Sequence, residues 1–128
     1  MPEKFTICIV DDDQSVREAL VGLMKSHGYD THAFGSGASF LAFSRFRQTD
    51  CLIADVHMPE MTGLELCGRL AQLGVCIPTI LITARHDDAV RERALKSGVF
   101  CYLAKPFKEE HLLNCIRSSL HKPNATGG

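Results

Sequence analysis

Aspartates stand directly after two of the apolar segments in this sequence, and they are the residues best suited to chemistry. Residues 11–13, all aspartates, follow the apolar run 5–10, and Asp55 follows the apolar run 51–54. A buried carboxylate costs free energy unless it has a partner, so acids at the edge of a core point to a bound cation. Ligands that are all oxygen suit Mg²⁺, or Mn²⁺ as a second possibility, better than zinc.

Two further polar residues follow apolar runs in the same way. Thr83 comes directly after the run 79–82, and Lys105 comes two positions after the run 100–103. A carboxylate beside a divalent cation and an ammonium group is arranged to attack phosphorus, because both positive charges neutralise the phosphoryl oxygens. The carboxylates of Asp11, Asp12 and Asp55 would also balance in charge with one divalent cation and Lys105. The residue types therefore indicate phosphoryl transfer.

Strand-like runs that alternate with helix-like segments must position these side chains. The strand-like runs are residues 5–10, 32–34, 51–54, 79–82 and 100–103. Helical periodicity occurs over residues 14–27, 36–46, 63–73, 88–97 and 108–120. Strict alternation of the two kinds predicts an α/β fold, in which helices cover both faces of a parallel sheet. Such sheets bind ligands at the carboxyl ends of their strands, where the residues above lie.

Length and composition fit one domain. The chain has 128 residues, with 14 basic and 15 acidic ones and a formal net charge of -1. This balance excludes a strong field that would attract nucleic acid or an anionic membrane. No apolar run approaches the roughly 20 residues of a membrane span, and the N-terminus has no signal-peptide pattern. The six cysteines include no CxxC pair, so we expect free thiols, a reducing compartment, a cytoplasmic location and no membrane partner.

Four short motifs occur in order along the chain: VDDD at residues 10–13, DVHMPEMTGLEL at 55–66, LITAR at 81–85 and AKPF at 104–107. Together they resemble the receiver domain of two-component response regulators. The resemblance runs from about residue 5 to residue 120. It implies a (βα)5 doubly wound, five-stranded parallel sheet of the flavodoxin-like, CheY-like type with strand order 2-1-3-4-5. In that order the first and third strands are neighbours, so their acids converge.

The resemblance also implies a role for each site residue. The phosphoacceptor position falls on Asp55, the switch hydroxyl on Thr83 and the phosphate-contacting lysine on Lys105. The switch aromatic falls on Tyr102. The implied ligands of the metal ion are Asp11, Asp12, Asp55 and the backbone carbonyl of His57. Hydrolysis of the acyl phosphate is expected to be tuned by two variable positions, here the side chains of His57 and Arg85.

The function implied is a phosphorylation-dependent signalling switch. A sensor histidine kinase would phosphorylate Asp55 with Mg²⁺ bound, and the change would reach the face formed by residues 88–97, 100–103 and 108–120. That face would control an output, expected to be transcription, as in the FixJ/LuxR-type regulators that the chain resembles most. It is also the expected face of a phosphorylation-dependent homodimer. Such a domain is a regulator and not an enzyme, since it catalyses only its own phosphorylation and dephosphorylation.

The predicted receiver domain covers residues 1–121, and residues 122–128 read as a linker-like tail that leads to an output domain. DNA would be bound only by such a domain outside this chain. Three alternatives stay open. The run of acids superficially fits a haloacid-dehalogenase-type phosphohydrolase, and the alternation fits a flavodoxin-like flavin carrier. A docking module that works without phosphorylation is the hardest alternative to exclude.

Several residues have simpler explanations than a role in the site. We expect Asp13 to favour the start of the first helix and not to bind metal. Phe40, Phe43 and Phe46 lie at helical spacing and are predicted to be core residues, as are Cys8, Cys51 and Cys101. No Cys/His spacing indicates a zinc site. The histidines other than His57 are predicted to lie on the surface; they are His27, His32, His86, His111 and His121.

Overall fold

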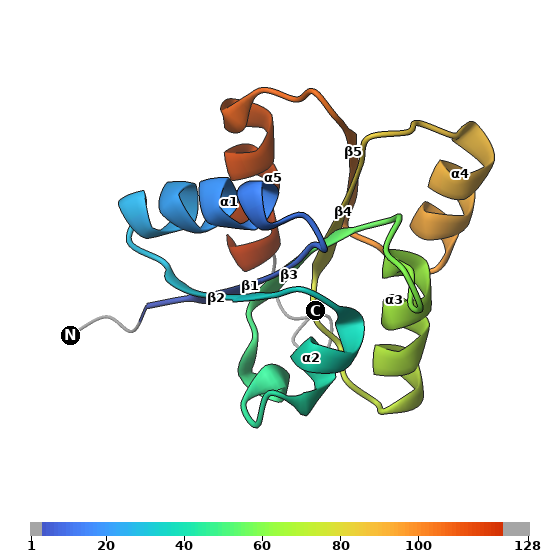
Figure 1. Ribbon diagram of the computed structural model, residues 1–128, viewed down its shortest axis with the longest axis horizontal. Coiled ribbons are helices and arrows are strands. Elements are labelled where there is room, and N and C mark those ends of the chain that lie inside the picture. The colour runs from blue at the N-terminus through green and yellow to red at the C-terminus, as the bar shows by residue number, and fades with distance from the viewer. Residues whose placement is uncertain (1–3, 122–128) are drawn as a thin grey trace.

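The computed structural model describes residues 4–121, and within them a parallel sheet of five strands forms the centre of the molecule (Figure 1). The strands are β1 (Thr6–Val10), β2 (Asp30–Phe34), β3 (Cys51–Asp55), β4 (Thr79–Thr83) and β5 (Cys101–Ala104). Their order in the sheet is β2-β1-β3-β4-β5, and each neighbouring pair is parallel. The predicted fold class and strand order are therefore confirmed.

Helices cover both faces of the sheet (Figure 1). They are α1 (Gln14–Ser26), α2 (Gly37–Ala42), α3 (Gly63–Gln72), α4 (Asp88–Lys96) and α5 (Glu109–His121), with a short 3₁₀ helix, η1 (Phe46–Gln48). Successive side chains of a strand point to opposite faces, so the central strands supply two cores. One core packs against α2, α3 and α4, and the other packs against α1 and α5. In the described residues no helix is long and apolar enough to span a membrane.

The second helix differs from the prediction of one helix over residues 36–46. Ser36 does cap it, since its Oγ accepts the N–H of Ser39 at 3.1 Å. However, α2 ends at Ala42, and Phe43 takes an extended conformation with ψ 123°. The ring of Phe43 lies 5.3 Å from that of Phe34 in β2. Packing against a distant strand thus ends the helix and begins the turn that leads to η1.

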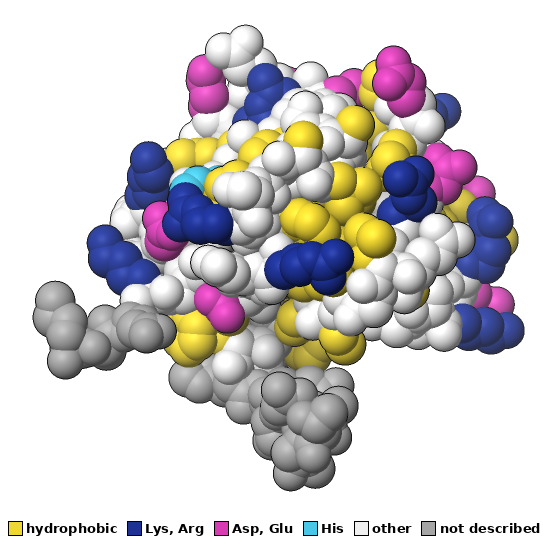
Figure 2. Space-filling view, turned by 90° about the horizontal axis from the view of Figure 1, so that it is seen from below, with side chains coloured by type: hydrophobic (Ala, Val, Ile, Leu, Met, Phe, Trp, Pro, Cys, Tyr) yellow, Lys and Arg dark blue, Asp and Glu magenta, His cyan; other side chains and the backbone are white. Residues whose placement is uncertain are grey.

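The aromatic residues of this segment form one cluster beside β2. Phe40 is fully buried, and its ring lies 5.7 Å from that of Phe46. Phe43 and Phe46 are only partly buried, and Arg45 and Arg47 lie over their rings at 5.1 and 5.2 Å. The view from below, the side where α2 and α3 lie, shows hydrophobic and basic side chains next to each other (Figure 2). The core prediction is therefore right for Phe40 and only partly right for the other two rings.

The cysteines, and the histidines apart from His121, whose side chain lies outside the described part, mostly follow the predictions. All six cysteines are free, Cys8 and Cys51 are buried, and Cys101 is half-buried. Burial raises the pKa of Cys8 to about 11 and that of Cys51 to about 12, as expected for inert thiols in a core. His32 is a correction, because its side chain is only 25% exposed and its ring lies 5.0 Å from that of Phe43. The linker-like tail predicted for residues 122–128 lies outside the described part of the chain.

Candidate metal and phosphoacceptor site

The acids that follow β1 and end β3 come together at the carboxyl edge of the sheet. β1 pairs with β3 so that Val10 lies opposite Ala54, and the next residues of the two strands are Asp11 and Asp55. One carboxylate oxygen each from Asp11, Asp12 and Asp55 lies within 4.8 Å of the others. Asp11 and Asp55 are buried, whereas Asp12 is exposed. The acid cluster, as we call these three residues, is thus sunk into the sheet edge and open to solvent on one side.

Asp11 is the most constrained member of the acid cluster. Its side chain is fully buried, and its Oδ1 accepts the backbone N–H of Asp13 at 2.9 Å. Its Oδ2 accepts no hydrogen bond from the described residues, and the Lys105 ammonium lies 3.7 Å away. Burial raises the pKa of Asp11 above its usual value, and the charge of Asp55 acts in the same direction. A buried carboxylate oxygen without a donor, beside two other carboxylates, fits a divalent cation.

The loop after β3 holds Asp55 in place. The backbone N–H of His57 donates to Asp55 Oδ1 at 3.1 Å, which fixes the rotation of the carboxylate. The N–H of Gly63 then donates to the carbonyl of Val56 at 3.1 Å, so the loop folds back onto the strand end. A Cβ at Gly63 would lie only 2.6 Å from the carbonyl oxygen of Asp55, which explains why the loop closes on a glycine.

Thr83 and Lys105 occupy the neighbouring strand ends. The backbone N–H of Lys105 donates to the carbonyl of Thr83 at 2.7 Å, and the Lys105-Pro106 peptide bond is cis. The buried Thr83 hydroxyl donates to the carbonyl of Arg85 at 2.9 Å and accepts the Arg85 N–H at 3.0 Å. Lys105 is therefore brought to the acid cluster, while the hydroxyl of Thr83 is turned toward the loop between β4 and α4.

The remaining predicted residues lie on β5 and in the loops that follow β3 and β4. Tyr102 is on β5, opposite Leu81 of β4, and its hydroxyl oxygen is buried without a hydrogen-bond partner among the described residues. His57 is half-buried and Arg85 is exposed. Asp13 is not a member of the acid cluster; its side chain caps α1 by accepting the N–H groups of Ser15 and Val16. The prediction that Asp13 serves the helix and not the metal is consistent with this geometry.

Sequence reasoning missed two residues that contact the site. The guanidinium of Arg17 in α1 donates to the backbone carbonyl of Asp11 at 2.6 Å and so anchors the acidic loop from behind. The only signal for it was its position, six residues after Asp11 and close to the start of α1. His86 was predicted to be a plain surface residue, and its side chain is 49% exposed. Its ring nevertheless lies against that of Tyr102, with the centroids 6.0 Å apart.

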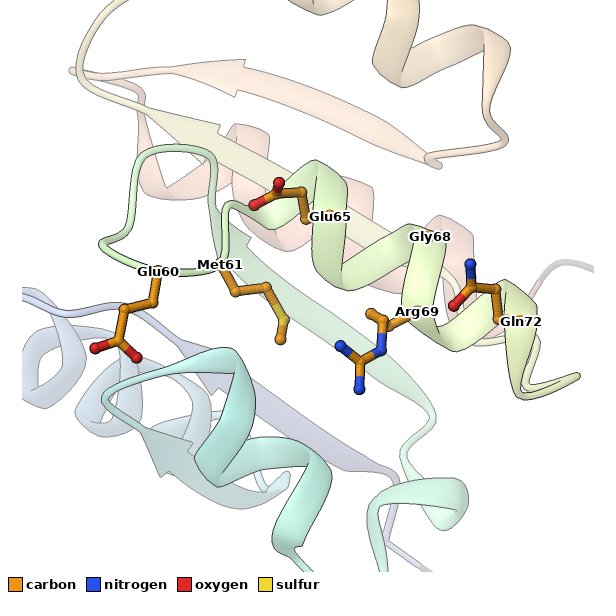
Figure 3. Close-up of a pocket in the computed structure, with 6 residues that line it drawn as sticks. All are labelled: Glu60, Met61, Glu65, Gly68, Arg69 and Gln72. Carbon is orange, nitrogen blue, oxygen red and sulfur yellow. The ribbon is translucent and has the colours of Figure 1, made fainter.

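A separate open pocket of about 320 Å³ lies beside α3 (Figure 3). Glu60 and Met61 line it from the loop after β3, and Glu65, Gly68, Arg69 and Gln72 line it from α3. Glu60 has a φ of 70°, in the left-handed region that is uncommon for residues with a side chain. None of the acid cluster lines this pocket, so it is distinct from the candidate site.

Comparison with known proteins identifies the fold and the family. The family model of the response regulator receiver domain matches residues 7–117. The response regulator protein TmoT of Ectopseudomonas mendocina is 42% identical over 118 residues, which cover 92% of this chain and 54% of TmoT. The transcriptional regulatory protein FixJ of Rhizobium meliloti is 34% identical over 118 residues, which cover 91% of this chain and 58% of FixJ. The chain thus spans about half the length of the curated relatives it matches.

Solved structures agree with the sequence comparison. The crystal structure of FixJ-N matches with a TM-score of 0.85 and 30% identity, over 97% of this chain and 99% of that chain. The structure of the response regulator StyR matches with a TM-score of 0.84 and 39% identity, over 92% of this chain and 60% of that chain. The resemblance inferred from the four motifs is therefore confirmed. The chain belongs to the family of response regulator receiver domains, the regulatory modules of two-component systems.

Proposed function

We propose that this chain is a phosphorylation-dependent switch in which Asp55 accepts a phosphoryl group from a sensor histidine kinase. One observation carries the proposal: the Asp55 carboxylate lies within 4.8 Å of carboxylate oxygens of Asp11 and Asp12. The Lys105 ammonium lies 3.7 Å from Oδ2 of Asp11. Three carboxylates this close repel one another unless positive charge lies beside them. Their arrangement therefore favours a site that binds a cation during phosphoryl transfer.

The donor set fits Mg²⁺, with Mn²⁺ as an alternative. The carboxylates of Asp11, Asp12 and Asp55 and the backbone carbonyl of His57 would hold the ion. Asp11 Oδ2, which accepts no hydrogen bond from the described residues, is an oxygen that such an ion would satisfy. When bound, the cation supplies charge neutralisation for the phosphoryl oxygens. All other steps belong to residues of this chain.

In the transfer, an oxygen of Asp55 forms a bond to phosphorus while the bond from phosphorus to the imidazole nitrogen of the donor breaks. The electron pair of the broken bond returns to the donor histidine. The His57 N–H keeps the Asp55 carboxylate in one orientation, and the Lys105 ammonium neutralises charge on the phosphoryl group. We expect the side chains of His57 and Arg85, each two residues beyond a strand end, to tune how readily water attacks the acyl phosphate.

The output step begins at Thr83. Its hydroxyl would exchange its bonds to the Arg85 backbone for one to a phosphoryl oxygen, and Tyr102 would then change position. We infer that this remodels the face of α4, β5 and α5, which would control transcription and support a homodimer when the chain is phosphorylated. The domain, residues 1–121, would act in the cytoplasm, and DNA would be bound only by an output domain outside this chain.

The phosphohydrolase alternative is disfavoured by the first loop, because α1 begins at Gln14, directly after the acids, and leaves no room for a cap insertion. The flavin-carrier alternative is disfavoured by the same loop, which is acidic where a phosphate cradle needs free N–H groups. A docking module that works without phosphorylation stays an alternative that experiment must separate.

Intact-mass spectrometry after incubation with acetyl phosphate tests the proposal. The wild-type chain should gain one phosphoryl group only when Mg²⁺ is present, and Asp55→Asn should gain none. Asp13→Asn is the matched control, since it removes a neighbouring acid outside the acid cluster and asparagine caps helices as well as aspartate does. If Asp55→Asn gains the phosphoryl group as the wild type does, the assignment of Asp55 is wrong. If no variant gains it, and beryllofluoride also fails to bind, the docking module is favoured.

A further inference from the structure

The position of Tyr102 is costly in this structure. Its hydroxyl oxygen is buried, and among the described residues no donor or acceptor meets it. A buried hydroxyl that has given up water without gaining a partner destabilises the conformation that contains it. The ring must therefore be held in this position by other contacts, which makes those contacts the place where the switch can be controlled.

His86 supplies such a contact. Its ring meets that of Tyr102 edge to face, with the centroids 6.0 Å apart and the ring planes at 64°. This is a favourable geometry for an aromatic pair. The ring of His86 is itself oriented, because its Nε2 lies 2.8 Å from Oδ1 of Asp88 in the first turn of α4. His86 therefore connects the start of α4 to the ring on β5.

The same loop is tied to Thr83. The Thr83 hydroxyl makes two hydrogen bonds to the backbone of Arg85, at 2.9 and 3.0 Å, and Arg85 is the residue directly before His86. A Thr83 hydroxyl that turns away from the loop would release both bonds at once. The next residue after Arg85 is His86, whose ring contacts that of Tyr102.

We propose that His86 is a positioning residue for Tyr102, and that it couples the hydroxyl of Thr83 to the tyrosine ring through the backbone of Arg85. His86 stabilises the position that Tyr102 has in this structure and opposes the position that phosphorylation favours. The effect on signalling rests on the proposed function. The placement of the Tyr102 ring does not, and it can be measured without any phosphoryl group.

Fluorine NMR of protein labelled with 3-fluorotyrosine provides that measurement, because the chain has only two tyrosines, Tyr29 and Tyr102. A Tyr29→Phe variant assigns the Tyr102 signal. In the unphosphorylated protein, His86→Ala should move this signal, and His86→Phe, which keeps a ring at that position, should largely restore it. His111→Ala is the control, since it removes an exposed histidine on α5 and should leave the signal unchanged.

A double-mutant cycle tests the coupling to Thr83. If the loop transmits the change, the shifts caused by Thr83→Ala and His86→Ala should not be additive. His86→Ala should also raise the rate of phosphorylation by acetyl phosphate about threefold, as expected for the loss of one aromatic pair that opposes the active state. Additive shifts would overturn the coupling.

An unchanged Tyr102 signal in His86→Ala would overturn the proposal as a whole. This outcome differs from failure of the proposed function. A wild-type chain that takes no phosphoryl group would remove the role of Asp55, yet the Tyr102 signal would still decide whether His86 positions the ring. A variant that is phosphorylated normally but leaves the signal in place would reject His86 alone.

Discussion

The two ends of the sheet differ in whether their polar groups have hydrogen-bond partners. At the amino ends of the strands, polar groups have hydrogen-bond partners within the chain: Thr79 Oγ1 donates to the carbonyl of Ile77 at 2.9 Å, and the N–H of Thr6 donates to Asp50 Oδ2 at 2.7 Å. At the carboxyl ends, Asp11 Oδ2 accepts no hydrogen bond from the described residues, although the Lys105 ammonium lies 3.7 Å away. Tyr102, the second residue of β5, has its ring against that of His86 in the loop after β4, and its buried hydroxyl also has no hydrogen-bond partner among the described residues.

This difference separates groups that stabilise the fold from groups reserved for function. A buried polar atom without a partner costs free energy, and folded proteins seldom keep one without a reason. The polar groups named at the amino ends already make hydrogen bonds within the chain. At the carboxyl ends, an Asp11 oxygen beside Lys105 and the acid cluster remains available to a cation or a phosphoryl group. Substitutions at the two ends should therefore have different and even opposite effects.

The largest effect is expected for Lys105→Met, which removes a positive charge from the functional end. We expect the rate of phosphorylation by acetyl phosphate to fall about 100-fold, as for other groups that neutralise charge in a transition state. Intact-mass spectrometry over time measures this rate. Lys108→Met is the matched control, because this lysine is exposed and outside the site. A rate within threefold of the wild type for Lys105→Met would mean that the ammonium does not assist the transfer.

The second effect concerns the shape of the functional end. In Gly63→Ala the new Cβ would lie 2.6 Å from the backbone oxygen of Asp55 and 2.9 Å from Leu81 Cδ2. Because backbone atoms cannot easily move aside, we expect the free energy of unfolding to fall by about 2 to 3 kcal/mol.

Urea denaturation measures this change, and Gly68→Ala in the same helix is the control. Apart from the neighbouring residues and backbone of its own helix, no atom of the described residues lies within 4 Å of a Cβ at Gly68. This variant should therefore gain about 0.5 to 1 kcal/mol from helix propensity. If both variants shift the urea midpoint in the same direction, the close contact of Gly63 with Asp55 does not constrain the loop.

The sequence predicted some features of this contrast and not others. Features that depend on neighbouring residues in the sequence were predictable, whereas features that depend on distant residues were not. Apolar runs that end in a polar residue placed Asp55 and Thr83 correctly, because a strand end is a local pattern. The convergence of Asp11 with Asp55 is not local, since it depends on β1 and β3 being neighbours. That strand order came from the resemblance to a family and not from the alternation of strands and helices.

Side-chain contacts between distant elements were the least predictable. The end of α2 depends on the ring of Phe43 meeting Phe34 of β2, whereas helical spacing alone favoured a longer helix. The partner of Tyr102 depends on where a loop directs His86. Neither contact has a signature in the sequence, because each is decided by packing across the sheet or at its edge.

The third prediction tests whether the buried carboxylate of Asp11 destabilises the fold when no cation is bound. Without divalent cations, Asp11→Asn should raise the free energy of unfolding by about 1 to 2 kcal/mol, because it removes one of three crowded negative charges. Thermal unfolding with and without Mg²⁺ measures the change. Mg²⁺ should stabilise the wild type and leave the variant nearly unaffected. A variant that is less stable than the wild type in the absence of Mg²⁺ would mean that Asp11 is a structural acid.

The smallest effect is expected at the amino ends and has the opposite sign. Thr79→Val keeps the shape of a buried side chain but leaves the carbonyl of Ile77 without its donor at 2.9 Å. Removing the donor of this partly buried hydrogen bond should lower the free energy of unfolding by about 1 kcal/mol, whether or not Mg²⁺ is present. Urea denaturation in both conditions checks this. If Thr79→Val instead stabilises the chain as Asp11→Asn is expected to, the hydrogen bond from Thr79 to Ile77 adds nothing to stability. The proposed contrast between the two ends of the sheet would then be wrong.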